Sequence, residues 1–352
     1  MLLPALSLNV GNLNTVLLII TTIITCSVKL QKVIFFLIFI PSLARAQERL
    51  VAVQLPKDSV VIFDLQKGIE KGQIKVGFLP HEITYDRNTK RCFVSNFGLQ
   101  DYDNRIGHPG NSIAVINPWS CTYVKNIYTT SDTSKGNAPH GIKVRPGKWK
   151  ELYTNVEIGA DSMLIFDLRT DLLKKKFGLP KSSHNFIFSD DGKKLWVMAA
   201  NEGVFELDPE NGEILHHQSF TSPIRGLALG NNWIVASGNN EVFLLSKKDL
   251  HILKHFANLG VGQILYSNIT HNQKFILCPA VDENIVLVID VNSKRVIHRI
   301  STLKGPINVQ MTKYFAYVSH DEDNFITKID LKNFISSHAY KASGTNGLIL
   351  IR

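Results

Sequence analysis

After residue 46 the chain alternates short hydrophobic runs with clusters of turn-forming residues. No stretch of this part keeps the helical period long enough to predict a layer of helices. The runs are rich in Val, Ile, Leu and Phe, and Gly, Asp, Asn or Ser bound many of them, which is typical of β-strands joined by tight turns. We therefore expect an all-β body.

One strand pattern occurs seven times. Each copy is a run of alternating or wholly apolar residues, such as VLVID over residues 286–290, and it ends in a small turn-forming residue. The closing residues are Asp64, Asn117, Asp167, Asp208, Ser246, Asp290 and Asp330. They follow one another at intervals of about 40–50 residues, and a repeat of that length carrying several strands is typical of a β-propeller.

The fourth repeat shows how one unit is built. Strands are expected over residues 184–190, 194–200, 204–208 and 213–220. Four strands in an antiparallel meander make one blade. The closing Asp or Asn has a structural role in this interpretation, because its side chain can accept hydrogen bonds from backbone N–H groups two residues on and so close the turn to the outer strand.

The two ends of the body predict how the ring closes. The chain stops after one inner strand, residues 347–351, and the body begins with a second strand, residues 50–55. Together they complete a blade, which removes the two open edges of an incomplete ring. We therefore predict a single seven-bladed β-propeller domain over residues 47–352, made of four-stranded antiparallel blades.

Several short stretches resemble the repeat of the YVTN-type seven-bladed β-propellers. They are YTN (153–155), FVSN (93–96), YVS (317–319), NIVLVID (284–290) and PHGI (139–142). The resemblance covers nearly the whole body, residues 49–352, and departs most over residues 232–247. It implies the fold and leaves the function open, because the similar families include periplasmic propellers, lactonases and related isomerases, and haem-d1-binding propellers.

Residues 1–46 predict a leader. Lys29 and Lys32 precede the apolar residues 33–40, and Ala44-Arg45-Ala46 has the A-x-A pattern of a cleavage site. We expect a secretory signal over residues 29–46 and a periplasmic or secreted protein. The apolar stretch within residues 1–28 has two explanations: an extension upstream of the true start of the protein, or an uncleaved N-terminal membrane anchor. Such an anchor would be the protein's one contact with a membrane.

Composition and charge exclude several classes of function. With 352 residues, 44% hydrophobic and 20% charged, the chain has a globular composition. The net charge of +9 includes three cations in the leader, and the rest are spread along the body, so we expect no nucleic-acid partner. We also expect a monomer.

The body cysteines leave two explanations open. Cys92, Cys121 and Cys278 show no spacing typical of a metal site. In an oxidising compartment Cys92 and Cys121 could form a disulfide. The alternative is three buried free thiols.

A candidate site follows from the geometry of a propeller. In each blade the start of the inner strand and the loop between the second and third strands lie on the same rim, around the mouth of the central channel. The residues expected at the seven starts are all polar: His81, His140, His184, Arg225, Gln263, Asn308 and Asn346. The neighbouring loops supply Asn96, Asp103, Glu157, Asp161, Glu202, Asn239, Asp282, Glu283, Asp321, Glu322 and Asp323.

The first four starts form an arc of three histidines followed by Arg225. Successive blades are expected about 10 Å apart, so one metal ion held by all three histidines is doubtful, whereas two adjacent histidines with a loop carboxylate could hold one. A larger anionic ligand that spans the arc fits better, because arginine binds a carboxylate or phosphate group through two parallel hydrogen bonds.

The most unusual segment is GLQDYDNRIGHPG, residues 98–110. It lengthens one loop of the second blade and is expected to place Tyr102, Asp103, Arg105 and His108 over the arc. Long loops on rigid scaffolds often carry function. The structural alternative is a surface insertion.

Three functions are compatible with this site. The leading hypothesis is a non-enzymatic exported propeller that binds a small anionic ligand or a protein partner on its rim. The second is a lactonase-like enzyme, in which His140 or His184 acts as acid or base with Glu202 and Arg225. The third is noncovalent haem or divalent-metal binding by an arc histidine, since no CxxCH haem motif is present in the sequence.

Overall fold

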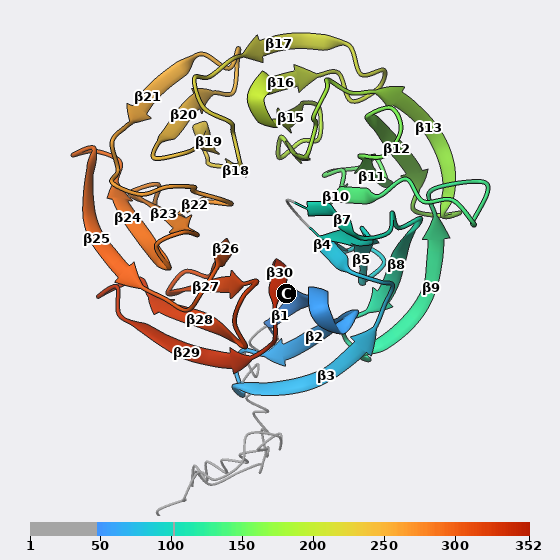
Figure 1. Ribbon diagram of the computed structural model, residues 1–352, viewed down its shortest axis with the longest axis horizontal. Helices are drawn as coiled ribbons and strands as arrows, with labels where there is room; N and C mark the ends of the chain where they lie inside the picture. Colours follow the sequence, from blue (N-terminus) through green and yellow to red (C-terminus); the bar gives the residue numbers. More distant parts are fainter. Residues whose placement is uncertain (1–47, 101–102) are drawn as a thin grey trace, which may run out of the picture. The chain divides into compact units, whose positions relative to one another are not determined.

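The computed structural model describes residues 48–100 and 103–352; the predicted leader, residues 1–46, lies outside the described residues. The body is nearly all β and forms a closed ring of seven four-stranded antiparallel sheets (Figure 1). This confirms the predicted seven-bladed β-propeller. Within the described residues no helix is long and apolar enough to span a bilayer.

The first four blades follow the predicted repeat. From the inner to the outer strand, blade one is β30 (Thr345–Ile351), β1 (Arg49–Gln54), β2 (Ser59–Asp64) and β3 (Ile69–Lys75). Blade two is β4 (Pro80–Asp86), β5 (Arg91–Asn96), β8 (Ser112–Asn117) and β9 (Thr122–Tyr128). Blade three is β10 (Pro139–Val144), β11 (Glu151–Val156), β12 (Ser162–Asp167) and β13 (Leu172–Gly178). Blade four is β14 (Asn185–Phe188), β15 (Leu195–Ala199), β16 (Gly203–Leu207) and β17 (Ile214–Gln218).

The remaining blades continue around the ring. Blade five is β18 (Gly226–Leu229), β19 (Trp233–Ser237), β20 (Val242–Ser246) and β21 (Ile252–Phe256). Blade six is β22 (Asn268–Ile269), β23 (Phe275–Ala280), β24 (Ile285–Asp290) and β25 (Arg295–Ser301). Blade seven is β26 (Pro306–Met311), β27 (Phe315–His320), β28 (Phe325–Asp330) and β29 (Ser336–Lys341). A separate hairpin of β6 (Leu99–Gln100) and β7 (Asp103–Gly107) and two short 3-10 helices, η1 (Leu55–Lys57) and η2 (Ala200–Glu202), complete the described elements.

The ring closes as predicted, by pairing the last strand with the first. β30 lies beside β1 in Figure 1, and Val51 pairs with Ile349 in an antiparallel register. Side chains alternate along β1: Leu50 packs in a hydrophobic cluster with Tyr317 of blade seven, whereas Val51 packs with Val94 of blade two. A strand buried on both faces cannot be lost without exposing two inter-blade clusters.

The closing residues of the third strands make the expected turns. Asp64 Oδ1 accepts hydrogen bonds from the backbone N–H groups of Gln66 and Lys67, each over 3.0 Å. In the other six copies the side-chain oxygen likewise accepts a hydrogen bond from the backbone N–H two residues on. These six residues are Asn117, Asp167, Asp208, Ser246, Asp290 and Asp330. Their structural role is confirmed, because each side chain is engaged in its own turn.

The inner strand of blade six departs from the prediction. It is only two residues long, and Gln263, expected at its start, instead forms an isolated bridge with Asn239 of blade five. Pro279 in β23 explains the break. Its carbonyl accepts a hydrogen bond from the Leu265 N–H, but proline has no N–H with which to donate a hydrogen bond to the inner strand.

The three cysteines of the described residues are free. Cys92 is fully buried and Cys121 is partly buried in the same inter-blade cluster, and neither forms the disulfide considered from the sequence. Cys278 is also free and fully buried. The alternative of free thiols is therefore the correct one, although Cys121 keeps some exposure.

Candidate functional site

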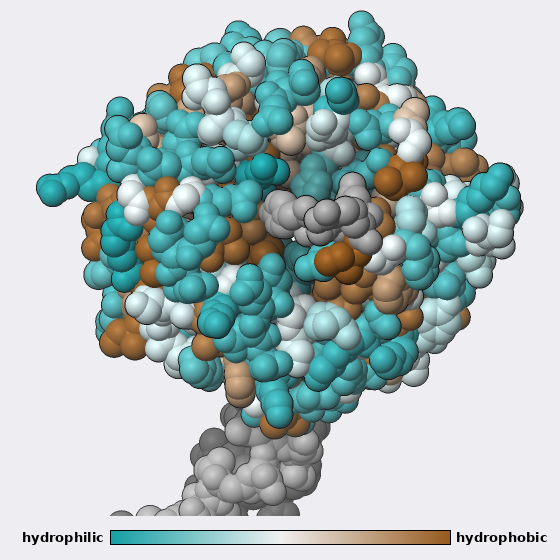
Figure 2. Space-filling model, viewed as in Figure 1, coloured by the Kyte–Doolittle hydropathy of each residue, from teal (hydrophilic) through white to brown (hydrophobic). Residues whose placement is uncertain are grey.

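The predicted arc lies on one rim of the ring. His81 and His140 are the second residues of β4 and β10, and His184 and Arg225 immediately precede β14 and β18. The labels of β4, β10 and β18 lie beside the central opening of the ring in Figure 1. Mostly hydrophilic residues cover the visible face of the ring, with hydrophobic ones scattered among them (Figure 2).

The three histidine side chains converge more closely than blade spacing suggests. The ring centroids of His81 and His140 are 4.2 Å apart, and those of His140 and His184 are 4.1 Å apart. His81 and His140 are fully buried, whereas the His184 side chain is 25% exposed. The close approach of the inner strands of blades three and four favours glycine beside His140, because a Cβ on Gly141 would lie 2.8 Å from Asn185 Oδ1 and 3.2 Å from the Asn185 Cα atom.

Two neighbours hold the buried end of this histidine group. Phe97 packs edge-on against His81 and His140, with ring centroids 5.5 and 4.7 Å away. Asn346, at the start of the closing strand, contributes its Nδ2 atom 2.9 Å from His81 Nε2. His81 therefore belongs to the packing between blades one and two rather than to an open surface.

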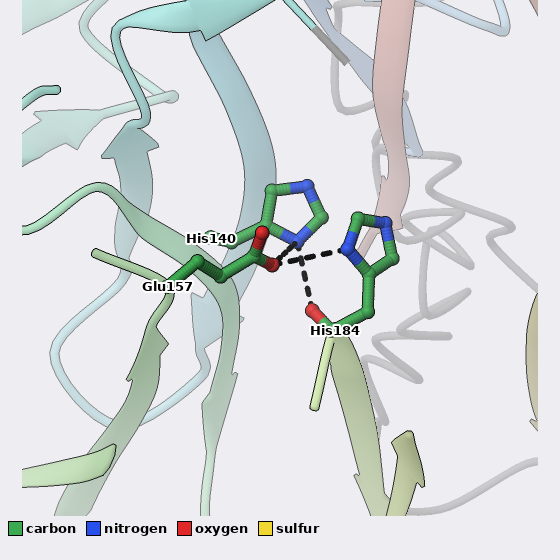
Figure 3. A group of neighbouring side chains, drawn as sticks. All are labelled: His140, Glu157 and His184. Carbon is green, nitrogen blue, oxygen red and sulfur yellow. Dashed lines mark hydrogen bonds and ion pairs between the residues drawn. The ribbon is translucent and has the colours of Figure 1, made fainter. Parts of the chain in front are cut away.

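Glu157 ties the other two histidines together (Figure 3). Its Oε1 atom lies 3.2 Å from His140 Nδ1 and 3.0 Å from His184 Nδ1. His140 Nδ1 also lies 2.8 Å from the carbonyl oxygen of His184. Because this carbonyl can only accept a hydrogen bond, His140 carries its proton on Nδ1.

A pocket of about 330 Å³ opens beside this group. The lining residues are Glu157, Asp161, Lys181, Ser182, Ser183, His184, Ala200, Ile224 and Arg225. Asp161 Oδ2 accepts a hydrogen bond from the Ser182 N–H over 2.8 Å. Burial raises the pKa of the Asp161 carboxyl, and the negative charge of Glu157 raises it further. We call this pocket the rim pocket.

A second, smaller cavity of about 80 Å³ lies in the channel. Glu82, Lys143, Asn308 and Tyr266 are among its lining residues. Tyr266 comes from the irregular segment before β22, and its hydroxyl accepts a hydrogen bond from Asn185 Nδ2 over 3.3 Å. Asn308 thus lines the channel, and the structure does not bring it into the rim pocket.

The predicted loop of blade two forms the β6–β7 hairpin. Its base is held by backbone hydrogen bonds from His108 to Gly98 and from Gly110 to Phe97. His108 stacks on Phe78 with ring centroids 4.8 Å apart, and both line a separate pocket with Lys135. Tyr102 lies outside the described residues, as do the side chains of Asp103 and Arg105.

Several predicted rim residues have structural contacts. Asn96 Nδ2 donates to Ser112 Oγ, and Asp282 Oδ2 accepts from the Gln263 N–H. Glu202 is exposed in η2 and is absent from the lining of the rim pocket. The structure therefore does not support Glu202 as the acid of a lactonase-like site. Glu157 takes its place beside the histidines.

Sequence reasoning named Glu157 only as one acid of a loop and did not foresee that it bridges two histidines. Phe97 was missed as their packing partner. The only available signals were the position of Glu157 directly after the second strand of blade three and that of Phe97 directly after β5, both at the rim. Neither position shows which way a side chain turns.

The comparisons with known proteins identify the fold. No family model matches the chain, and no curated protein sequence matches it. The dihydro-heme d1 dehydrogenase NirN, solved in complex with DHE, is similar with a TM-score of 0.60 and 9% identity, over 86% of this chain and 74% of that one. A functionally unknown protein from Desulfotomaculum acetoxidans DSM 771 is similar with a TM-score of 0.66 and 9% identity, over 86% of this chain and 99% of that one. At this identity the similarity shows a shared β-propeller fold alone.

Proposed function

We propose that the protein is an exported, monomeric binding module that holds a small anionic ligand in the rim pocket, with no catalysis assumed. The observation that carries the proposal is the joint presence of Arg225, Lys181 and His184 in the lining of one pocket. Arginine and lysine are the side chains that recognise carboxylate and phosphate groups, and arginine does so with two parallel hydrogen bonds.

The dimensions of the rim pocket favour a small ligand. Its volume of about 330 Å³ lies at the lower end of the range of about 300–1,000 Å³ usual for ligand pockets. The two acids in the lining already have neighbours: Glu157 Oε1 lies 3.2 and 3.0 Å from the Nδ1 atoms of His140 and His184, and Asp161 accepts a hydrogen bond from the Ser182 backbone. Arg225 and Lys181 supply positive charge in the same lining.

Calorimetric titration tests the proposal with a panel of defined anions: inorganic phosphate and small mono-, di- and tricarboxylates. We expect at least one to bind saturably to the full-length chain, and Arg225→Ala to weaken its binding at least about tenfold, since a hydrogen bond to a charged group contributes about 1.5–3 kcal/mol. Arg169→Ala is the matched control, because Arg169 is exposed and pairs with Asp167 in the turn after β12. An equal loss in both variants, or no binding by any anion, would contradict the proposal.

A noncovalent haem is the second candidate, and His184 favours it. The ring of His184 is partly exposed, and its Nδ1 lies beside Glu157, an arrangement that orients the ring so that Nε2 is the coordinating atom. The structural neighbour NirN is named as a dihydro-heme d1 dehydrogenase, which gives a reason to test haem as a ligand. Titration with haemin should then give a shifted absorbance band that His184→Ala abolishes, whereas an unchanged spectrum in that variant rejects haem ligation by His184.

A further inference from the structure

We infer that His140, Glu157 and His184 form a binding site for one divalent transition-metal ion at the inner end of the rim pocket. The inference deepens the proposed ligand-binding role of this pocket, but it requires no anion. It rests on the distances, the donor chemistry and the rigidity of the three residues, which come from two adjacent blades (Figure 3).

The donor atoms already lie at distances suited to one ion. A single oxygen, Glu157 Oε1, lies 3.2 Å from His140 Nδ1 and 3.0 Å from His184 Nδ1. Bonds of about 2.0–2.1 Å around a tetrahedral zinc ion put neighbouring donors about 3.3 Å apart. One ligand atom from each of the three side chains lies within 4.8 Å of the other two, so a small inward movement completes the set.

The chemistry of the set points to a class of metal. Two imidazole nitrogens and one carboxylate oxygen suit zinc, iron, nickel and similar divalent ions, whereas calcium and magnesium prefer oxygen donors alone. Imidazole binds a metal through an unprotonated nitrogen, so each ring carries its proton on Nε2 when the ion is bound. A neutral ring reaches this state by moving its proton from Nδ1 to Nε2, and a doubly protonated ring releases one proton to solvent. The bond from His140 Nδ1 to the His184 carbonyl is given up at the same time.

The three residues are held by the scaffold and not by flexible loops alone. His140 lies within β10, is fully buried and packs between the rings of His81 and His184. The Glu157 N–H is hydrogen-bonded to the carbonyls of Asn137 and Ala138, and the His184 N–H to the carbonyl of Met198. Backbones fixed in this way limit the reorganisation that metal binding requires.

The position of the group also provides access and an open coordination site. The side chains of Glu157 and His184 are 21% and 25% exposed, and both line the rim pocket, whereas His140 is at the buried end. Three protein ligands leave a fourth position for water or a ligand group. That position would face the rim pocket, which also contains Arg225, so an anion could contact the ion and the guanidinium together.

The competing explanation is a carboxylate that merely orients two histidines. To separate the two, the full-length chain is prepared without a polyhistidine tag, stripped with a chelator and titrated calorimetrically with Zn²⁺ in buffer free of coordinating anions. We expect saturable binding of one ion per chain in the micromolar range or tighter. Co²⁺ should bind at the same site and give visible absorption bands.

Variants locate the ion. Glu157→Gln and His184→Ala should each weaken Zn²⁺ binding by more than about tenfold, because even residues that only support metal ligands cost about 10–100-fold when replaced. Glu70→Gln and His271→Ala are matched controls, since both residues are exposed and lie outside the group. Thermal unfolding of each variant checks that a loss of binding is not a loss of fold.

The outcomes are decisive in each direction. Absence of saturable binding, or equal affinity in the wild type and Glu157→Gln, overturns the metal site. Arg225→Ala separates this inference from the proposed function, because it should keep Zn²⁺ binding and lose the anion. A chain that binds Zn²⁺ but no anion therefore keeps the metal site and rejects the anion-binding role, and the reverse result does the opposite.

Discussion

His140 donates a hydrogen bond from Nδ1 to the backbone carbonyl oxygen of His184, over 2.8 Å. This bond joins the inner strand of blade three to the start of blade four. The two imidazoles pack against each other at a tilt, yet their surroundings differ, because His140 is fully buried and the His184 side chain is 25% exposed. The same residue type therefore has different expected roles at the two positions.

We predict that His140→Ala destabilises the protein by about 2–4 kcal/mol, because it leaves a cavity and removes the partner of the His184 carbonyl. His184→Ala should cost less than about 1 kcal/mol, since its ring lies at the edge of the rim pocket. Urea unfolding followed by far-UV circular dichroism measures both values. Equal destabilisation by the two changes would refute this division of roles.

Loss of the closing strand should prevent folding of the ring. Deleting residues 345–352 removes β30, exposes the edge of β1 and uncovers Leu50 and Ala52 in the cluster between blades seven and one. We expect aggregated or unfolded protein by gel filtration and circular dichroism. Deleting only Arg352, which is exposed and contacts Glu48, is the control and should leave a monomeric folded chain. A folded monomer lacking β30 would contradict the prediction.

The body thiols should differ in reactivity. Burial raises the pKa of the Cys92 thiol and raises that of Cys278 to about 12, so neither forms the reactive thiolate near neutral pH. Cys121 is only partly buried. A thiol reagent at pH 8 should therefore modify Cys121 first, and Cys92 and Cys278 only after unfolding, as peptide mass mapping would show. Fast modification of Cys92 in the native state would be inconsistent with this structure.

Acid should weaken the fold partly through His320. Burial lowers the pKa of this imidazole from 6.5 to about 4, an effect that the nearby charge of Asp323 opposes and that of His338 reinforces. Between these pH values the unfolded chain binds a proton that the folded chain does not, so stability is complete above about pH 6.5 and falls as the pH drops towards 4. The full difference is roughly 3 kcal/mol.

The test of this acid effect compares urea unfolding of the wild type and His320→Gln at pH 7 and pH 4.5. The variant loses the hydrogen bond between His320 Nε2 and Thr327 Oγ1, so its stability at pH 7 should be lower. Its further loss on acidification should nevertheless be smaller than that of the wild type. Parallel losses in the two proteins would show that His320 does not contribute.

The positions of the rim residues were only partly predictable. His81, His140, His184, Arg225 and Asn346 lie at the starts of inner strands, as the repeat indicated, because strand ends follow from local alternation and turn residues. Gln263 was misplaced because the effect of Pro279 acts across the sheet: it breaks a ladder between segments that are distant in sequence. Glu202 was expected near the histidines, but the turn of η2 leaves it exposed.

By itself, the sequence determined the number of blades, their four-stranded order and the closure of the ring. These features follow from periodic hydrophobic runs and from Asp or Asn turns that hydrogen-bond within a few residues. Only the tertiary structure decided that three imidazoles pack against one another and that the Glu157 carboxylate lies between two of them. The physical reason is that such contacts depend on how neighbouring blades pack and on which rotamers that packing permits, and no local pattern of residues specifies either.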